Sequence, residues 1–591
     1  MSHISEDSSR LERDNIQIAS LDQLNNYQSN EANVYLLQLP FGRTDLDASQ
    51  SSIVYKKINR FCRQLPPAST VCILTTPPEA ARMLPFLEHT LKFQLWIAVE
   101  ISSAENYEPT DSLPERHAAL LVLTRYQGAL RHTKTRIRYT YCAFCGKTTK
   151  DYGGKKHTYH EDGTLLSDVW RDMSCNPAED IEPIIDRLQD LFGLKEYRSL
   201  KVLDMSSCSE LARKDLSERE CLSYSTQMPA TSPLPDSVLL NVDCLEGLAT
   251  LPDNSVDFCF ADPPYNLKKK YSHWQDGMEL VDYFNWCDQW LGELSRVLKP
   301  GGTLAVLNIP LWSVRHYQYL CSREDLHYQN WIVWDAMSFP VRLIMPSHYT
   351  ILCFSKGEPR PLPGFQQGGV PLIEKADLAP LSDAFCIRDT CISRRRRARV
   401  NDQEELNDVW HDIHRLKHNS HRVDHPCQLP PQLMRRLYAL FTRPGEWILD
   451  CFNGAGTSTL VAQQMGRKYI GMELSPQYHE LARQRHEELS MGKEPFGKVK
   501  TIPTAKNSRV ERLPKQHYEV SKKTLQLDVK RVAQQLGRLP TRKEVEQLSR
   551  YSISYYDNYF ISWGEVCAAA RTTGMTEIQA GREQSGQLSL F

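Results

Sequence analysis

Residues 260–267, Phe260-Ala261-Asp262-Pro263-Pro264-Tyr265-Asn266-Leu267, close an apolar run that begins at Val256. The run is typical of a buried strand, and the two prolines force the chain out of the sheet in a rigid, extended turn. In such a turn Asp262 and the Pro263 carbonyl can accept both hydrogens of a planar amine, while Tyr265 offers a face for stacking. A strand-end turn without any catalytic role explains the motif Asp262-Pro263-Pro264-Tyr265 equally well.

A second turn of interest lies nearly two hundred residues further along the chain. The predicted strand at 447–449 runs into Asp450-Cys451-Phe452-Asn453-Gly454-Ala455-Gly456-Thr457. Its glycines allow a tight turn, so that backbone amides at the start of the next helix can meet a ligand. The next predicted strand, Ile470-Gly471-Met472, ends at Glu473, an acid placed to bind ribose hydroxyls. Taken alone, the glycine turn fits any nucleotide-binding site.

Together these segments resemble the amino-methylating DNA methyltransferases, in the class whose substrate motif precedes the cofactor motif. The resemblance spans roughly residues 237–489, and it implies a Rossmann-like α/β fold, S-adenosyl-L-methionine as cofactor, and flipping of a base out of duplex DNA. The catalytic residues that it implies are Asp262, Pro263, Pro264 and Tyr265. The cofactor-binding residues that it implies are Asp243, Gln428, Asp450, Phe452, Gly454, Gly456, Thr457 and Glu473.

In this family an acid at the first position of the substrate motif usually accompanies adenine. The resemblance therefore implies a site-specific adenine-N6 methyltransferase of the restriction-modification type, with cytosine N4 as the alternative and a cognate restriction endonuclease as a partner. A methyltransferase acting on RNA or protein is less favoured. So is a catalytically inactive DNA-binding protein, because Asp262 and both glycines of the second turn are present.

The composition is that of an ordinary globular protein, with 24% charged and 41% hydrophobic residues in 591. The apolar runs are too short to span a bilayer and the N-terminus has no signal-peptide core, so we expect a cytoplasmic protein without membrane contact. Because the net charge is only −1, DNA binding must depend on local basic patches. The candidates are Lys268, Lys269 and Lys270 after the substrate motif, and Arg394, Arg395, Arg396 and Arg397. A solvated charged face is the alternative for both runs.

The N-terminal third of the chain echoes the middle third. Residues 33–42 align with residues 257–266 at a constant offset, and Ser167-Asp168-Val169-Trp170 aligns with Asn407-Asp408-Val409-Trp410. We infer a divergent, catalytically silent copy, because Gln38 replaces the acid of the substrate motif and no glycine turn follows Asp204. One chain would then act as a monomer that imitates a dimer. Two unrelated α/β domains that share tryptophan motifs are the alternative.

These patterns predict an α/β protein with duplicated Rossmann-like units, the first degenerate and the second active, plus a small all-α module. The C-terminal module resembles the homing-endonuclease-associated repeat, with Thr541 as a helix N-cap and Phe560-Ile561-Ser562-Trp563 before a further helix. It would contact DNA, or serve only as a packing appendage. The predicted boundaries are 14–210 for the degenerate domain, 211–235 for a linker, 236–490 for the catalytic domain with a target-recognition insert at about 357–421, 491–519 for a second linker, 520–575 for the repeat and 576–591 for a disordered tail.

Seventeen cysteines without a secretory signal favour free thiols or a metal over disulfides. Cys142 and Cys145 have the spacing of a zinc knuckle, which supplies half of a four-ligand site. Cys386 and Cys391, in the corresponding interval of the second copy, can complete a structural zinc site across the duplication. His157 and His160 can complete it locally instead, and buried free thiols are the third alternative.

Overall fold

The structure is a computed structural model that describes residues 16–18, 24, 34–40, 48–102, 111–125, 130, 132–139, 141–142, 144–147, 160, 162–173, 175–176, 180–194, 200–205, 234, 236–267, 277–336, 344, 346–362, 378–382, 386, 388–416, 423, 425, 427–496, 520, 522–560 and 563–568. The chain forms two compact units, residues 1–505 and 506–591. None of the helices in these ranges is long and apolar enough to cross a membrane.

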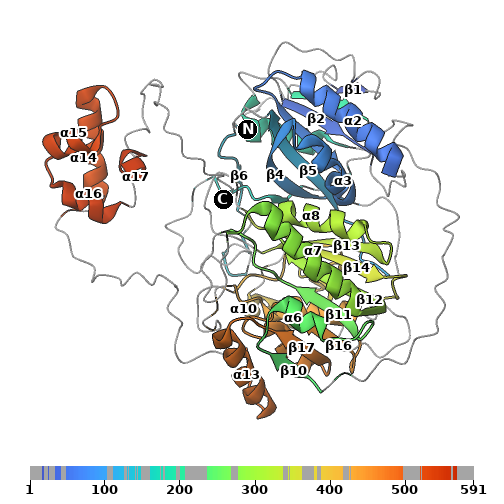
Figure 1. Cartoon of the computed structure of the whole chain (residues 1–591). Helices are drawn as coiled ribbons and strands as arrows, with labels where there is room; N and C mark the ends of the chain where they lie inside the picture. The colour runs from blue at the N-terminus through green and yellow to red at the C-terminus, as the bar shows by residue number, and fades with distance from the viewer. Residues whose placement is uncertain are drawn as a thin grey trace. The chain divides into compact units, whose positions relative to one another are not determined.

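The second half of the larger unit is built on an eight-stranded sheet with the order β10-β17-β16-β11-β12-β14-β13-β15 (Figure 1). Its strands are β10 (Val238–Leu240), β11 (Val256–Ala261), β12 (Leu298–Asn308), β13 (Leu326–Asp335), β14 (His348–Lys356), β15 (Val409–Trp410), β16 (Trp447–Asp450) and β17 (Lys468–Met472). All neighbours are parallel except β14, which runs antiparallel to both β12 and β13. The expected Rossmann-like arrangement of mostly parallel strands is thus present, with β15 at one edge of the sheet.

Helices on both faces bury the apolar strands of this sheet, as parallel sheets require. They are α6 (Cys244–Ala249), α7 (Leu280–Val297), α8 (Pro310–Cys321), α11 (Pro431–Phe441), α12 (Thr457–Gln464) and α13 (Pro476–Ser490), while α10 (Asp389–Arg397) belongs to the segment between β14 and β15. Helix α7 is amphipathic and buries Tyr283 together with Trp290 and Leu294. The predicted α/β class is confirmed by this alternation of strands and helices.

The first half of the unit has its own seven-stranded sheet, with the order β1-β9-β2-β3-β5-β4-β8. Its strands are β1 (Ile16–Ile18), β2 (Val34–Gln38), β3 (Thr70–Thr75), β4 (Leu91–Glu100), β5 (His117–Arg125), β8 (Val169–Trp170) and β9 (Leu200–Asp204), and β6 (Arg136–Ile137) pairs separately with β7 (Thr164–Leu165). Its helices are α2 (Ala48–Gln64), α3 (Pro77–Leu87) and α4 (Glu182–Phe192).

The two sheets share strand order and strand direction from β9 to β8 and from β16 to β15. In each sheet one central strand, β5 or β14, is antiparallel to both neighbours. The pairing register also shifts at equivalent places, between Phe93 and Leu95 in β4 and between Tyr328 and Asn330 in β13. They differ at the edge, because β1 pairs directly with β9 whereas β17 lies between β10 and β16.

Equivalent elements of the two sheets meet each other inside the unit. Trp96 of β4 stacks on Trp331 of β13, with ring centroids 5.0 Å apart and planes inclined by 5°. Helices α3 and α8 pack together between the sheets (Figure 1). A buried apolar cluster joins the matching strand pairs and consists of Ala98, Val169, Val333 and Val409. The contact thus resembles the self-complementary interface of a twofold dimer.

Polar contacts across this interface are reciprocal as well. Asp408 accepts a hydrogen bond from the Arg116 backbone N–H at 2.8 Å and lies 2.8 Å from His117 Nδ1. In the matching position of the first half, Asp168 accepts from the backbone N–H of His348 at 3.0 Å. Burial raises the pKa of Asp168 to about 7, against the opposing effect of these backbone donors.

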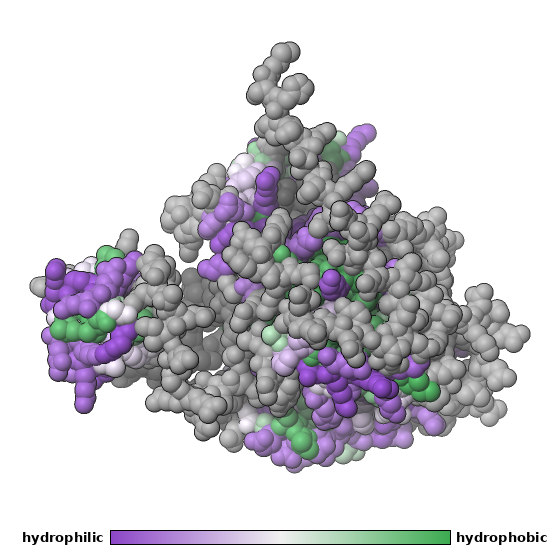
Figure 2. Space-filling view, turned by 90° about the horizontal axis from the view of Figure 1, so that it is seen from above, coloured by the Kyte–Doolittle hydropathy of each residue, from purple (hydrophilic) through white to green (hydrophobic). Residues whose placement is uncertain are grey.

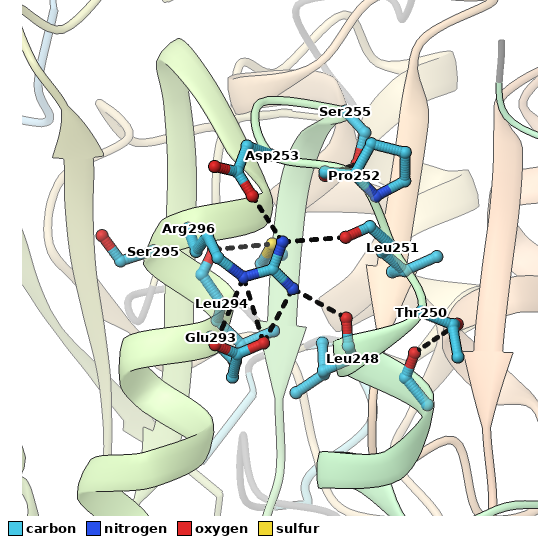
Figure 3. Close-up of polar contacts among 12 residues, drawn as sticks. Leu248, Thr250, Leu251, Pro252, Asp253, Ser255, Glu293, Leu294, Ser295 and Arg296 are labelled. Atoms are coloured by element: carbon cyan, nitrogen blue, oxygen red, sulfur yellow. Dashed lines mark hydrogen bonds and ion pairs between the residues drawn. The ribbon is translucent and has the colours of Figure 1, made fainter. Parts of the chain in front are cut away.

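An arginine in α7 holds the loop that leads into β11 (Figure 3). The Arg296 guanidinium donates to the Leu248 carbonyl at 2.9 Å and the Leu251 carbonyl at 2.8 Å, and it contacts Asp253 at 2.6 Å. Glu293, one turn earlier in the same helix, accepts from it at 2.7 Å. Because Leu248 belongs to α6 and Leu251 to the connection between α6 and β11, Arg296 ties both to α7 ahead of the strand that leads to Asp262.

The smaller unit contains four described helices, α14 (Lys522–Leu536), α15 (Arg542–Leu548), α16 (Ile553–Tyr559) and α17 (Trp563–Ala568). Thr541 and Glu544 form the expected reciprocal capping box at the start of α15. Helix α16 was not predicted, because its apolar face is built from tyrosines. A small core that includes Leu525, Val545 and Tyr556 holds the helices together, and the visible surface is mostly hydrophilic (Figure 2).

Candidate functional site

One continuous cavity opens at the carboxyl ends of β11, β16 and β17. The predicted site residues that line it are Asp243, Asp262, Pro263, Pro264, Tyr265, Gln428, Phe452, Gly454 and Glu473. It therefore joins the substrate turn after β11 to the glycine turn after β16. Ligands of open α/β sheets bind at this edge of the strands.

The Asp262 turn is held rigid by hydrogen bonds from surrounding helices. Tyr283 of α7 donates to the Pro264 carbonyl, and Trp312 of α8 donates to the Tyr265 carbonyl, each at 2.8 Å. The Tyr265 hydroxyl donates to Asp262 Oδ1 at 2.8 Å. Burial, followed by the charge of Asp262, raises the pKa of Tyr265 well above its usual value. Tyr265 is therefore a neutral donor that orients the carboxylate.

Aromatic side chains that were not predicted from the sequence complete the end of the cavity formed by the Asp262 turn. Trp334 and Tyr349 are opposite each other on β13 and β14, with ring centroids 5.5 Å apart, and Tyr349 lies 6.2 Å from Tyr265. The Arg415 guanidinium lies over the Tyr349 ring at 5.5 Å. Because β14 is antiparallel, it begins at the same edge of the sheet where β11 ends, and this pairing places Tyr349 in the cavity without any local sequence signal.

The glycine turn forms the other end of the cavity. Gly454 has a φ of +53° and its N–H donates to Glu473 Oε2 at 2.8 Å. A Cβ at this position would lie 2.9 Å from the His425 ring, and that ring packs against Tyr478 with a centroid distance of 4.6 Å. Phe452 lies against Trp290 at 5.3 Å. Since His425 and Tyr478 also line the cavity, the turn leaves room only for a bare backbone.

Three polar side chains, those of Glu473, Asp243 and Gln428, line the cavity near the glycine turn. Glu473 Oε1 accepts a hydrogen bond from the Ser475 N–H at 2.8 Å. Both carboxylate oxygens of Glu473 therefore accept hydrogen bonds from backbone N–H groups. Asp243 is the N-cap of α6 and accepts from the Leu245 N–H at 2.9 Å, so the structural and the ligand-binding interpretation apply to the same residue. Gln428 Nε2 is buried, and none of the described residues accepts a hydrogen bond from it.

Three predicted cofactor residues lie behind the cavity wall. Asp450 is buried and accepts from Ser458 and from the Phe452 N–H, and burial raises the pKa of its carboxyl to about 7. Gly456 has a φ of +79° and precedes α12, where a Cβ would lie 2.9 Å from Ala482. Thr457 is the buried first residue of that helix. These three residues do not line the cavity, and they support the glycine turn from the side away from it.

The predicted DNA-contacting arginines do not form one surface. Arg394, Arg396 and Arg397 of α10 are exposed, but Arg395 is 1% exposed and its guanidinium lies 2.7 Å from Asp402. Arg395 is corrected from a candidate DNA contact to a buried ion pair that anchors α10. Lys268, Lys269 and Lys270 lie outside the described residues, so their prediction is untested.

The four cysteines of the predicted metal site come together. The Sγ atoms of Cys142, Cys145, Cys386 and Cys391 all lie within 4.8 Å of one another. The local alternative is less favoured, because His160 is exposed and pairs with Asp162 at 3.4 Å, while His157 lies outside the described residues.

The sequence is similar to known DNA methyltransferases over the segment that contains the cavity. Residues 256–484 match the family model for DNA methylases of the N6/N4 type, and residues 520–570 match the homing endonuclease associated repeat. The Type II methyltransferase M.BamHI of Bacillus amyloliquefaciens is 34% identical over 266 residues, which cover 44% of this chain and 59% of that protein. The Type II methyltransferase M.HpaI of Haemophilus parainfluenzae is 28% identical over 254 residues, covering 42% and 74%.

Two solved structures show smaller overall similarity. TTHA0409 of Thermus thermophilus, described as a DNA modification methylase and complexed with S-adenosyl-L-methionine, is 24% identical with a TM-score of 0.28, covering 42% of this chain and 93% of that chain. The cytosine-N4-specific PvuII DNA methyltransferase is 17% identical with a TM-score of 0.31, covering 42% and 86%. The sequence matches carry the comparison: residues 256–484 are similar to DNA methylases of the N6/N4 type, and residues 520–570 are similar to the homing endonuclease associated repeat.

Proposed function

We propose that the protein is an S-adenosyl-L-methionine-dependent, site-specific DNA methyltransferase that methylates N6 of adenine. The observation that carries the proposal is the single cavity lined at one end by the Asp262 turn and at the other by Gly454 and Glu473. A methyl donor and an acceptor base can therefore occupy adjoining parts of one site. The similarity to Type II methyltransferases supports DNA as the substrate.

The donor end suits S-adenosyl-L-methionine. Gly454 leaves backbone open to the ligand, Glu473 ends the second strand with a carboxylate, and Gln428 Nε2 is a buried donor with no acceptor among the described residues. When bound, this cofactor supplies an electrophilic methyl group. The chain's own part is to hold it with backbone and carboxylate groups and to exclude water with the walls of Phe452 and His425.

The acceptor end suits an extruded base. Asp262 and the Pro263 carbonyl can accept both N–H groups of the amine, which directs its lone pair toward the donor end. Tyr265 and Tyr349 offer aromatic surface for stacking. Methyl transfer would form the N–C bond as the S–C bond of the sulfonium breaks, leaving S-adenosyl-L-homocysteine, and the amine would release its proton to solvent afterwards, so Asp262 would need to act only as a hydrogen-bond acceptor.

The test is mass spectrometry of nucleosides from unmethylated duplex DNA incubated with protein and labelled S-adenosyl-L-methionine. We expect labelled N6-methyladenine with the wild type and none with Asp262→Ala, whereas Gln38→Ala, in the corresponding turn of the first half, keeps full activity. Calorimetric cofactor binding by Asp262→Ala separates loss of chemistry from loss of fold. Labelled N4-methylcytosine would show that the target base is cytosine and not adenine. Methyl transfer by Asp262→Ala would refute the assignment of the catalytic site.

We also propose that the first half is a degenerate copy of the second and that one chain acts as an internal pseudo-dimer. Support comes from the shared strand order, the reciprocal contacts of Asp168 and Asp408, and the stacked Trp96 and Trp331. We expect a monomer in solution that binds one cofactor per chain. A stable dimer with two cofactors per chain would contradict the idea. A cognate restriction endonuclease stays a prediction.

A further inference from the structure

Four cysteine side chains from the two halves of the larger unit meet in one cluster. Cys142 and Cys145 lie between β5 and β8 of the first half, and Cys386 and Cys391 lie between β14 and β15 of the second. Each half therefore contributes two thiols from the corresponding interval. Three of the four are buried, and Cys145 is partly buried.

The spacing of the sulfur atoms is that of a tetrahedral thiolate site. The Sγ atoms of Cys142 and Cys391 are 3.8 Å apart, and so are those of Cys145 and Cys386. Zinc binds thiolate sulfur at about 2.3 Å, so tetrahedral geometry places two sulfurs roughly 3.8 Å apart. A disulfide would need about 2.05 Å. The distances thus fit a shared central ion better than bonded pairs.

Ordinary packing does not account for this cluster. The buried hydrophobic group around these sulfurs contains cysteines and no aliphatic side chain among the described residues. Elsewhere in the chain buried cysteines are dispersed in aliphatic core, as Cys259 and Cys353 are in the second sheet. Four thiols that face one another without leucine, valine or isoleucine between them form a metal-ligand set rather than a piece of core.

The backbone around the cysteines is shaped for this role. The Gly146 N–H donates to the Cys142 carbonyl at 2.8 Å, and the Cys142 N–H donates to the Lys147 carbonyl at 2.7 Å. Gly146 has a φ of +61°, which lets the turn close tightly around the first two thiols. Cys391 lies in the first turn of α10, and its N–H donates to the Arg388 carbonyl at 2.8 Å, which fixes the backbone that carries this thiol.

We propose that Cys142, Cys145, Cys386 and Cys391 bind one structural zinc ion. The ion connects the segment between β5 and β8 in the first half to the start of α10 in the second. All four thiols lose a proton when the ion binds, and four-coordination by sulfur leaves no open position for catalysis. The ion fixes the helix that presents Arg394, Arg396 and Arg397. The catalytically silent half thereby holds part of the surface of the active half.

The test measures zinc bound to the full-length protein after gel filtration in metal-free buffer with a thiol-free reductant. We expect one zinc per chain by elemental analysis, strong loss of zinc in Cys145→Ser and in Cys391→Ser, and full retention in Cys321→Ser, a control at the exposed end of α8. Wild-type protein reconstituted with Co²⁺ alone should show the thiolate charge-transfer and ligand-field bands of a tetrahedral sulfur site.

Two outcomes that overturn the proposal use the wild-type protein and do not depend on the folding of a variant. Wild-type protein that stays below about 0.1 zinc per chain after exposure to excess Zn²⁺ would refute it. So would a cobalt spectrum without thiolate bands, because the cobalt experiment uses the unaltered chain. Equal zinc content in all three variants would place the ion elsewhere and would likewise refute the assignment.

Discussion

Replacing Gly454 by alanine tests whether the glycine turn is the cofactor end of the cavity. The residue has a φ of +53°, and a Cβ there would lie 2.9 Å from His425 Nε2 and 3.0 Å from His425 Cε1. The His425 ring has little freedom to withdraw, because it packs on Tyr478 at 4.6 Å. Alanine must therefore move either the cavity wall or the backbone that donates to Glu473.

The size of the effect follows from the backbone geometry. A residue with a Cβ in the left-handed region costs about 1–2 kcal/mol. If the turn relaxes in the free protein and must return to its original shape to bind, the same energy is lost from binding. That loss raises the dissociation constant of S-adenosyl-L-methionine by about 5- to 30-fold. The contact with His425 adds to this value.

Isothermal titration calorimetry with S-adenosyl-L-methionine measures the change, and Gly445→Ala is the matched control. Gly445 has a φ of +84°, but a Cβ there meets no atom within 4 Å, and the residue does not line the cavity. Both variants should lose about 1–2 kcal/mol of unfolding free energy, and only Gly454→Ala should lose cofactor affinity. Wild-type affinity in Gly454→Ala, or an equal loss in Gly445→Ala, would refute the reasoning.

Four further predictions concern α10 and the interface between the halves. Arg395→Ala should lower the free energy of unfolding by about 3–5 kcal/mol in urea titrations, because it leaves a buried carboxylate unpaired. Arg396→Ala should leave stability unchanged and reduce the salt dependence of DNA binding by about one phosphate contact; an unchanged slope would exclude Arg396 as a phosphate contact. Asp168 has its pKa raised from 3.8 to about 7, so the native state holds a proton that the unfolded chain releases, and this contribution to stability is lost as pH rises between those values. Asp168→Asn should therefore flatten the dependence of unfolding free energy on pH between about 4 and 7, and an unaltered pH profile would show that Asp168 is ionised in the folded protein. Trp331→Ala should cost about 3–5 kcal/mol of unfolding free energy, because it also removes the stacking partner of Trp96; a loss below about 1 kcal/mol would mean that the two halves do not depend on each other.

The parts of the site that lie in contiguous motifs were predictable from sequence. Asp262 and Glu473 each follow an apolar strand directly, so the direction of the chain places both at one edge of the sheet. The alternation of strands and helices predicted for this segment also holds. Tyr349 was missed because its position depends on the antiparallel insertion of β14 between β12 and β13, which no local pattern reveals.

The arginine run shows a second limit of sequence reasoning. Five arginines in six residues give no direct sign of which one is buried. The helix supplies the answer, because Cys391 and Arg395 are four residues apart and both face inward. The cysteine pairs, in contrast, were predicted together because the inferred repeat puts them in corresponding intervals of the two halves, although the contacting residues are 241 and 249 positions apart.

The edge of the first sheet has a consequence for the history of this protein. In the second half the acid Glu473 leaves the end of β17, which is inserted between β10 and β16. In the first half β1 occupies the place next to β9, and it ends at Ile18 with Ala19 as the next residue. Among the described residues of the first half, no strand therefore corresponds to β17 and its terminal Glu473. If the first half is a degenerate copy, as proposed, an acid at Gln38 and glycines after Asp204 would restore two motifs but not this strand, which single substitutions do not supply.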